Sequence, residues 1–245
     1  LMKKKISIIF PVYNEVKTVK KAIDDVVNID YPNKEIIIID NGSQDGSREI
    51  IKNYRNKKVK IYKLLRNVNK GFGRSVTDGI KKATGHYIYI QYSDLEYDHK
   101  ASIYMMNYAE RKNLDVVLGS RLKSNKQSLL TTIINKPAYL ATLICTFLIN
   151  IFYGHKFTDI IGGKLYKTES IRKIKTNSYH AGFDFEFISR ICKKKLRIGE
   201  ISIKYRPRIN SSEKKIKFYH MLNALYEIFK VKLFKIRKKT KNLCF

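Results

Sequence analysis

The sequence predicts an α/β fold in which a mostly parallel sheet is sandwiched by helices, with an amphipathic helix near the C-terminus. Short runs rich in β-branched and aromatic residues alternate with helical patterns along the first half of the chain. These runs are apolar at consecutive positions, as expected for strands that are buried on both faces. Such strands are typical of parallel sheets that helices cover on both sides.

The predicted elements follow one another at short intervals. Strands are expected at ISIIF (6–10), EIIIID (35–40), VKIYKLL (59–65), HYIYIQ (86–91), DVVLGS (115–120) and LRIGEISIKY (196–205). Helices are expected near residues 15–28, 46–54, 72–83, 99–112 and 183–194, and a glycine-containing turn at FTDIIGGKLY (157–166). The pattern predicts one domain, large enough for an enzyme, over residues 1–210 and a basic amphipathic segment over residues 211–245.

The composition limits the classes of partner and the cellular compartments that are expected for the chain. The formal net charge of +29 favours a polyanionic partner, such as anionic lipid, a phosphorylated substrate or nucleic acid, unless it reflects only a lysine-rich surface. No nucleic-acid-binding motif accompanies the charge, so nucleic acid is not expected as a partner. The three cysteines are scattered without CxxC spacing, which predicts neither a disulfide framework nor a zinc site and favours a reducing, cytoplasmic location.

Two segments are candidates for contact with a membrane surface. The apolar stretch 138–153 is short for a bilayer crossing and contains polar residues. The C-terminal segment places a set of large apolar residues roughly on one helical face flanked by lysines: Phe218, Leu222, Leu225, Phe229, Leu233 and Ile236. Either segment can lie at a membrane interface or pack on the core with a solvated basic side. We expect the C-terminal segment to be an interfacial anchor that makes the chain peripheral on the membrane.

The residues that follow the predicted strands indicate where ligands bind. In an open parallel sheet, ligands bind beyond the carboxyl ends of the strands. The first strand is followed by PVYNE (11–15), the second ends at Asp40 before NGSQDGS, and the fourth is followed by QYSDLEYD (91–98). Each is also an ordinary turn sequence, but together they place amides, carboxylates and an aromatic ring along one edge. The carboxylates of QYSDLEYD are suited to Mg²⁺ or Mn²⁺, which prefer oxygen ligands.

Other ligand-binding motifs are weak or absent. GFG (71–73) opens a predicted helix, so Gly71 is a candidate for presenting a backbone N–H group to a nucleotide phosphate. The residues after it lack the GxGxxG spacing, and no GxxxxGK[ST] loop, HExxH pair or GxSxG turn occurs. The sequence therefore favours a divalent cation that is held by oxygen ligands beside a diphosphate.

In its motifs and their order, the chain resembles the family 2 glycosyltransferases with a GT-A fold, specifically the polyprenol-phosphate (dolichol-phosphate) sugar transferase branch. The matching stretches are SIIFPVYNE, EIIIIDNGSQDGS, NKGFGRSVTDGIKKATG, QYSDLEYD, VVLGSR, FTDIIGG, GFDFEF and IGEISIKYRPRINSSEKKI. The resemblance implies that a nucleotide is bound by Pro11, Tyr13, Glu15, Asp40 and Asn41. It also implies that Asp94 and Glu96 hold the cation, while Tyr92 stands where the family pattern has its first Asp.

The resemblance further implies an acceptor site. Arg121 is similar to an arginine of the family that contacts the acceptor phosphate, and Asp94 and Arg121 are expected to be the catalytic residues. Further contacts to the acceptor phosphate are implied for Arg208, Lys214 and Lys215. Two departures stand out. The turn after Asp159 is one residue shorter than is usual in the family, which leaves the placement of Asp159 and Lys164 open, and Ile188 occupies a position that is often acidic.

The implied activity is an inverting transfer of a sugar from a nucleotide-diphosphate sugar to a polyprenyl (dolichyl) phosphate at the cytoplasmic face of a membrane, with Mg²⁺ or Mn²⁺ as the cofactor. A phosphate acceptor is already anionic near neutral pH and needs no strong general base. Two alternatives stay open. One is transfer to a cell-surface saccharide, which requires a carboxylate facing a hydroxyl and is disfavoured by Ile188. The other is a catalytically weakened relative that only binds nucleotide sugars.

Overall fold

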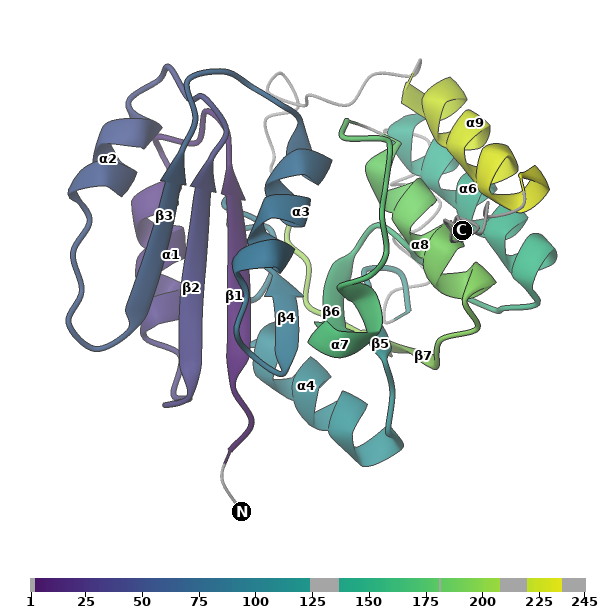
Figure 1. Ribbon diagram of the computed structural model, residues 1–245, viewed down its shortest axis with the longest axis horizontal. Helices are drawn as coiled ribbons and strands as arrows, with labels where there is room; N and C mark the ends of the chain where they lie inside the picture. Colours follow the sequence, from purple (N-terminus) through teal and green to yellow (C-terminus); the bar gives the residue numbers. More distant parts are fainter. Residues whose placement is uncertain (1–2, 124–136, 181, 208–219, 235–245) are drawn as a thin grey trace, which may run out of the picture.

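The computed structural model describes residues 3–123, 137–180, 182–207 and 220–234 (Figure 1). The strands are β1 (Ile6–Val12), β2 (Lys34–Asp40), β3 (Lys60–Leu65), β4 (Tyr87–Ile90), β5 (Val116–Ser120), β6 (Gly163–Lys167) and β7 (Ile198–Ser202). The helices are α1 (Val19–Val27), α2 (Ser47–Asn53), α3 (Phe72–Lys82), α4 (Ala101–Lys112), α6 (Pro137–Tyr153), α7 (Thr168–Ile171), α8 (Phe183–Lys193) and α9 (His220–Leu233). No described helix has both the length and the apolarity that a bilayer crossing requires.

All seven strands form one sheet in the order β3-β2-β1-β4-β6-β5-β7. β6 runs antiparallel to both of its neighbours, while the other paired strands are parallel. The sequence predicted a turn over residues 157–166, and the second half of that stretch is β6. Its side chains alternate between the two faces of the sheet, with Leu165 in one core and Tyr166 in the other. A Cβ atom at Gly162 would collide with the carbonyl oxygen of Gly119, so glycine is needed where β6 approaches β5.

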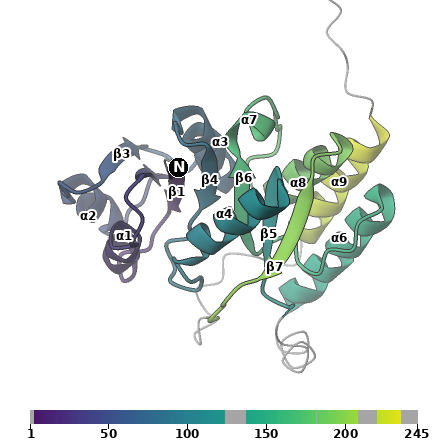
Figure 2. The ribbon, with the colours of Figure 1, turned by 90° about the horizontal axis from the view of Figure 1, so that it is seen from below.

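Both faces of the sheet are covered, as the apolar strands predict. α3, α6, α7, α8 and α9 share a core on one face, and α1, α2 and α4 share a core on the other (Figures 1 and 2). Within β1, Ile8 belongs to one core and Ile9 to the other, and both are fully buried. α1 shows the matching helical pattern, because its buried residues recur at spacings of three and four: Val19, Ala22, Ile23, Val26 and Val27. The predicted α/β sandwich is therefore confirmed.

The last described helix packs on the same core as the domain before it. α9 lies beside α6 and α8 in Figure 2, and it buries Ala224, Ile228 and Val231. The Lys193 ammonium of α8 donates hydrogen bonds to backbone carbonyls at the end of α9, including that of Phe234 at 2.9 Å. Packing on the core thus accounts for one side of this helix, and the division of the chain at residue 210 stays a prediction.

Candidate functional site

The carboxyl ends of β1 and β2 are joined into a rigid wall by hydrogen bonds between the loops that follow them. Asn14, whose φ is 53°, donates its N–H to Ser43 Oγ at 3.0 Å and accepts from the N–H of Gln44 at 2.9 Å. The N–H of Glu15 donates to Ser47 Oγ at 2.8 Å. Since these bonds connect one loop to the other, the PVYNE segment and the DNGS segment hold a fixed relative position at the edge of the sheet.

Asp40 ends β2 with one carboxylate oxygen that has no hydrogen-bond donor among the described residues. The side chain is fully buried, and its Oδ1 accepts from the N–H of Ser43 at 3.2 Å. Its Oδ2 has no hydrogen-bond partner, and the nearest cation is Arg48 at 3.8 Å. Buried acceptors are nearly always satisfied in folded proteins, and an unsatisfied one indicates a missing donor. Asp40 is therefore a candidate for receiving an N–H or O–H group of a ligand, and this role stays a prediction.

Asn41 is held in a network that fixes the loop before α3. Its Oδ1 accepts from Arg66 Nη1 at 2.8 Å and from the N–H of Lys70 at 3.1 Å, and its Nδ2 donates to Asn69 at 2.6 Å. Arg66 also pairs with Asp78 of α3 at 2.5 Å. The sequence did not single out Arg66, because nothing in its local pattern shows that a guanidinium will be buried. The network gives Asn41 a structural role in addition to its predicted contact with the nucleotide.

Gly71 has a structural reason to be glycine. Its φ is 86°, and a Cβ atom there would collide with the carbonyl oxygen of Tyr179. The N–H of Gly71 donates to Asn69 at 2.8 Å, and the N–H of Gly73 donates to Tyr179 at 2.8 Å. These two amide groups already have partners, so phosphate binding by Gly71 stays a prediction that the hydrogen bonding does not favour.

The QYSDLEYD loop leaves β4 and is fixed from both sides. Asp94 Oδ1 accepts from the N–H of Glu96 at 3.1 Å, and Leu95 between them has a φ of 61°. Glu96 Oε2 accepts from the Tyr205 hydroxyl at 2.8 Å. Asp94 and Glu96 are both partly exposed. Two carboxylates on one fixed loop are the set that Mg²⁺ or Mn²⁺ takes when a diphosphate supplies further oxygens. They thus fit the predicted cation, although no described group of three or more Asp, Glu, His or Cys residues forms a metal site by itself.

Tyr92 is partly buried, packs among aromatic rings and does not offer an anionic oxygen. Its ring stacks on Phe72 with centroids 5.7 Å apart and on Tyr97 with centroids 5.0 Å apart. Its hydroxyl accepts from the Lys164 ammonium at 3.1 Å. Burial, reinforced by the charge of Asp184, raises the pKa of Tyr92 well above its usual range, so the phenol stays protonated. The position at which the resemblance implies the first Asp of the family pattern is thus occupied by a neutral aromatic ring.

Lys164 lies beneath this stack as an almost fully buried cation. Its ammonium donates to the carbonyls of Ile161 at 2.9 Å and Gly162 at 3.2 Å, in addition to the Tyr92 hydroxyl. It also pairs with Asp184 Oδ1 at 3.3 Å. The structure thus brings Lys164 and Asp184, which the sequence did not assign to the site, against the cation loop. A buried ammonium is tolerated when it is paired and hydrogen-bonded, as here.

Arg121 forms a buried ion pair at the end of β5. Its Nε and Nη2 donate to the two carboxylate oxygens of Asp159 at 2.6 and 3.0 Å, and its guanidinium lies over the Tyr205 ring at 5.4 Å. Burial alone would raise the pKa of Asp159, but the charge and hydrogen bonds of Arg121 outweigh it and lower that pKa. The backbone N–H groups of Thr158 and Asp159 both donate to Glu200, which fixes the loop. The pair therefore sets the orientation of the guanidinium.

The acidic residues of α8 have different roles. Glu186 is fully buried and accepts hydrogen bonds from the N–H groups of Asn177 and Ser178 and from Arg190, so it shapes the preceding loop. Asp184 is 15% exposed and faces Lys164. Ile188 is fully buried in the core. A carboxylate at position 188 would not face a hydroxyl, so the argument that Ile188 disfavours a saccharide acceptor is wrong.

The predicted residues divide into those that gather at the edge of the sheet and those that the structure does not describe. Nine of them lie near the carboxyl ends of strands, in the loops that follow, or directly before α3, on the side toward which β1, β2 and β3 point (Figure 1): Pro11, Tyr13, Glu15, Asp40, Asn41, Gly71, Asp94, Glu96 and Arg121. We call this edge the rim. Arg208, Lys214 and Lys215 lie outside the described residues. The individual binding roles stay predictions.

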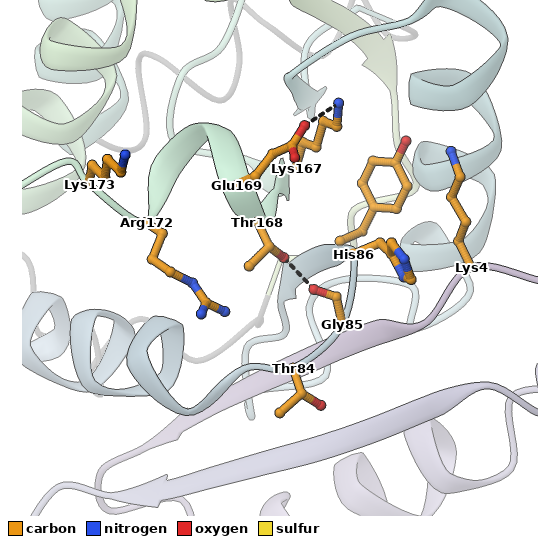
Figure 3. Close-up of a pocket in the computed structure, with 10 residues that line it drawn as sticks. Lys4, Thr84, Gly85, His86, Lys167, Thr168, Glu169, Arg172 and Lys173 are labelled. Atoms are coloured by element: carbon orange, nitrogen blue, oxygen red, sulfur yellow. Dashed lines mark hydrogen bonds and ion pairs between the residues drawn. The ribbon is translucent and has the colours of Figure 1, made fainter.

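A separate hollow lies at the opposite edge of the sheet. It has a volume of about 470 Å³, and none of the predicted site residues lines it (Figure 3). Three of its basic side chains already have partners: Lys4 with Glu110, Lys167 with Glu169, and Arg172 with the carbonyl of Ala83. The chemistry-bearing groups are at the rim, so we place the functional site there.

Comparison with known proteins identifies the family of the chain. The sequence model of glycosyl transferase family 2 matches residues 7–175, more than half of the chain. The chain belongs to glycosyl transferase family 2. The match covers β1 to α7, and it therefore includes the rim contributed by β1, β2 and β4, the Arg121–Asp159 pair and Lys164.

Two relatives are similar over about half of the chain. A poly-beta-1,6-N-acetyl-D-glucosamine synthase from Staphylococcus epidermidis is 36% identical over 127 residues, which cover 51% of this chain and 30% of that protein. A cholesterol galactosyltransferase from Borreliella burgdorferi is 35% identical over 115 residues, which cover 47% of this chain and 32% of that protein. The chain thus spans about a third of the length of these relatives.

A solved structure supports the fold over almost the whole chain. Glucosyl-3-phosphoglycerate synthase from Mycobacterium tuberculosis, in complex with Mn²⁺, UDP-glucose and phosphoglyceric acid, superimposes with a TM-score of 0.66 at 13% identity. The superposition covers 94% of this chain and 80% of that one. The GT-A fold is confirmed, while the polyprenol-phosphate branch stays a prediction.

Proposed function

We propose that the chain transfers a sugar from a nucleotide-diphosphate sugar to an acceptor, with inversion at the anomeric carbon and with help from a divalent cation. The observation that carries the proposal is the unsatisfied, fully buried Asp40 oxygen on the same rim as the Asp94 and Glu96 carboxylates. The Asp40 oxygen would accept a hydrogen bond from the nucleotide, and the Asp94 and Glu96 carboxylates would hold the cation beside the diphosphate. Family membership and the similar fold of an enzyme solved with Mn²⁺ and UDP-glucose support the same reading.

The donor half of the site is formed by the loops after β1 and β2. Nucleotide bases and riboses carry N–H and O–H groups, which Asp40 would accept. Tyr13 would lie against the base or its surroundings, because it leaves β1 beside the Asn14–Ser43 hydrogen bond. The wall of hydrogen bonds between these loops keeps the pocket preorganised, which lowers the entropic cost of binding.

Asp94 and Glu96 would hold Mg²⁺ or Mn²⁺. When bound, the cation neutralises negative charge on the departing diphosphate. The fixed loop supplies the positioning: the Asp94–Glu96 turn, together with the Glu96–Tyr205 hydrogen bond, presents both carboxylates from one rigid segment. Tyr92 contributes the aromatic wall behind them.

The first acceptor class is a lipid phosphate such as polyprenyl phosphate. Its oxygen is anionic near neutral pH, so the protein has to orient it rather than deprotonate it. Arg121 is the candidate for that role, since Asp159 fixes the plane of its guanidinium. The basic residues predicted for the same task, Arg208, Lys214 and Lys215, follow the strand segment that carries Tyr205.

The second acceptor class is a hydroxyl of a saccharide or a lipid, and one specific observation favours it. Asp184 is a partly exposed carboxylate beside the rim whose position is fixed by Lys164, so it is a candidate to take the proton of a hydroxyl acceptor. The relatives include a poly-beta-1,6-N-acetyl-D-glucosamine synthase and a cholesterol galactosyltransferase, and both a saccharide and cholesterol offer hydroxyls. Asp184 therefore separates the two acceptor classes.

Donor titration tests the proposal first. UDP, GDP, UDP-glucose and GDP-mannose are titrated calorimetrically with and without Mn²⁺, and we expect one nucleotide to bind more tightly with the metal. If none binds, the proposal fails. Binding without turnover on any phosphate or hydroxyl acceptor instead favours the catalytically weakened relative.

An Asp184→Asn variant then identifies the acceptor class. A general base contributes about 10²- to 10⁴-fold to the rate, so a hydroxyl acceptor predicts a loss of that size with donor affinity unchanged. A phosphate acceptor predicts nearly normal turnover. Glu169→Gln is the matched control, because Glu169 is an exposed carboxylate of α7 at the opposite edge of the sheet.

A further inference from the structure

Two neighbouring helices carry exposed apolar stripes with the same spacing. On α6 the stripe is Leu140, Ile144, Phe147 and Ile151, and on α9 it is Leu222, Tyr226, Phe229 and Leu233. In each helix the residues recur at positions i, i+4, i+7 and i+11, which places them on one side. Phe147 is 63% exposed and Leu233 is 72% exposed. We call these eight residues the α6–α9 face.

The two stripes are held in a fixed relation. α6 and α9 lie side by side (Figures 1 and 2). The Phe152 and Phe229 rings contact each other edge to face with centroids 5.2 Å apart, and the Lys232 ammonium donates to the carbonyl of Phe152 at 2.5 Å. The face is therefore a property of the folded unit rather than of one helix.

The core does not need the α6–α9 face. α6 buries Cys145 and Ile149, and α9 buries Ala224, Ile228 and Val231, all on the sides turned toward the sheet. Nine of the twelve large apolar side chains that are exposed in the described chain lie on these two helices or directly after them. Monomeric proteins rarely expose apolar residues in one patch of this kind, so the concentration indicates an interaction surface.

Charge identifies the occupant. α6 has no charged residue, while the sequence on both sides of α9 is strongly basic, with KKIK at 214–217 and KIRKKTK at 235–241. Apolar stripes flanked by lysines match the boundary of a bilayer with anionic headgroups. A second copy of this chain would bring the same basic segments together and repel them, since the net charge is +29. We propose that the α6–α9 face docks on an anionic lipid surface.

Docking would bring the acceptor half of the rim close to the lipid. α6 ends at Tyr153, and the chain then leads directly to Asp159, the partner of Arg121. α8 lies beside α9 and begins with the turn that carries Asp184. The link to a lipid acceptor rests on the proposed function, but the docking itself does not. It also joins the predicted C-terminal anchor to the other candidate segment, 138–153, in one surface built from two helices.

Vesicle sedimentation of the full chain tests the proposal. Phosphatidylcholine vesicles with and without phosphatidylglycerol are compared for the wild type and for two double variants, Phe147→Ser with Ile151→Ser and Leu222→Ser with Tyr226→Ser. We expect binding to the anionic vesicles that weakens with salt, and a loss of at least about tenfold in partitioning for each double variant. Melting temperatures should not change, because these side chains are exposed.

Tyr62→Ser is the matched control. Tyr62 is also a large exposed residue, but it lies on β3 at the far edge of the sheet, so its replacement should leave partitioning unchanged. The proposal is overturned if the wild type does not bind anionic vesicles or if the double variants bind as well as the wild type. It is also overturned if the wild type forms a dimer in solution that the same substitutions dissociate, since a second copy then covers the face.

The outcome is separable from that of the proposed function. Nucleotide titration of the double variants should give wild-type affinity, because the α6–α9 face is remote from Asp40. Vesicle binding without any nucleotide binding would count against the transferase and leave the docking surface standing. Nucleotide binding without vesicle binding would overturn the docking surface and leave the proposed transferase standing.

Discussion

Replacing Asp40 by asparagine should weaken donor binding without weakening the fold. The substitution preserves the shape of the side chain, and the retained Oδ1 still accepts from Ser43. It replaces the unsatisfied Oδ2 by an NH₂ group, which cannot accept a hydrogen bond from a ligand. The protein loses only a weak interaction with Arg48, which lies at 3.8 Å and is partly exposed.

The contacts of Asp40 set the expected change in nucleotide affinity and in the free energy of unfolding. A hydrogen bond to a charged group contributes about 1.5–3 kcal/mol, so the Kd of the nucleotide should rise by about tenfold to a hundredfold. The free energy of unfolding should change by less than about 1 kcal/mol, because that is the usual contribution of a partly exposed ion pair. Affinity and stability are thus expected to respond differently to one substitution.

Glu35 provides the matched control within the same strand. It is a buried carboxylate at the other end of β2, and it accepts hydrogen bonds from Lys5 at 2.7 Å, Ser7 at 2.6 Å and the N–H of Thr84 at 2.7 Å. Burial opposes its ionisation, but these bonds outweigh burial and lower its pKa from 4.5 to about 2. At about 1.4 kcal/mol per pKa unit, its ionised form contributes about 3 kcal/mol to stability. Glu35→Gln should therefore destabilise the fold and leave nucleotide affinity unchanged.

Urea unfolding and calorimetric titration of both variants, with UDP and GDP in the presence of Mn²⁺, measure the two quantities. Equal nucleotide affinity in Asp40→Asn and the wild type would refute the inference that the buried oxygen receives a ligand donor. A loss of stability in Asp40→Asn as large as that in Glu35→Gln would show that Asp40 is a structural carboxylate.

Three further predictions concern acid stability, the cation and the buried ion pair. Because the folded-state pKa of Glu35 lies below its ordinary value, its stabilisation is complete above about pH 4.5 and is lost as the pH falls toward 2, so Glu35→Gln should flatten this part of the stability profile in urea. Tyr92→Asp should raise the affinity for Mn²⁺ in the presence of UDP, and it should lower the melting temperature because the aromatic stack is lost. Tyr92→Phe should leave Mn²⁺ affinity unchanged. An unaltered Mn²⁺ affinity in Tyr92→Asp would show that this position is not a metal ligand. Asp159→Asn should cost about 3–5 kcal/mol, because it removes the buried carboxylate that pairs with the Arg121 guanidinium. Asp159→Leu with Arg121→Met should recover stability in urea but not sugar transfer. Recovered transfer would remove Arg121 from the mechanism.

The sequence predicted the parts of the fold that local pattern determines. The runs at β1 and β2 have apolar side chains on both faces of the strand, which predicts a sheet that is covered on both faces. In the structure, Ile8 and Ile9 lie in opposite cores. The rim after β1, β2 and β4 was also predictable, because the carboxyl ends of parallel strands meet at one edge. GKLYK in β6 was not, since glycine and lysine are depleted in strands.

The contacts of Lys164 explain why the other half of the site could not be predicted. A lysine beside glycines favours an exposed turn, yet this one is buried because two carbonyls, Tyr92 and Asp184 surround its ammonium. Tyr92 and Asp184 are distant in sequence from Lys164, so no local pattern links them. Ile188 shows the converse, because only the packing of α8 reveals that its position faces the core.

Because β6 runs antiparallel to its neighbours, the rim is built from two separate parts of the sequence, one before β5 and one after it. Everything that the nucleotide and the cation are proposed to contact precedes β5, and everything proposed for the acceptor follows it, because β6 begins at the rim and brings the loop of Asp159 with it. A recombination crossover within β5 would therefore exchange one half as a block.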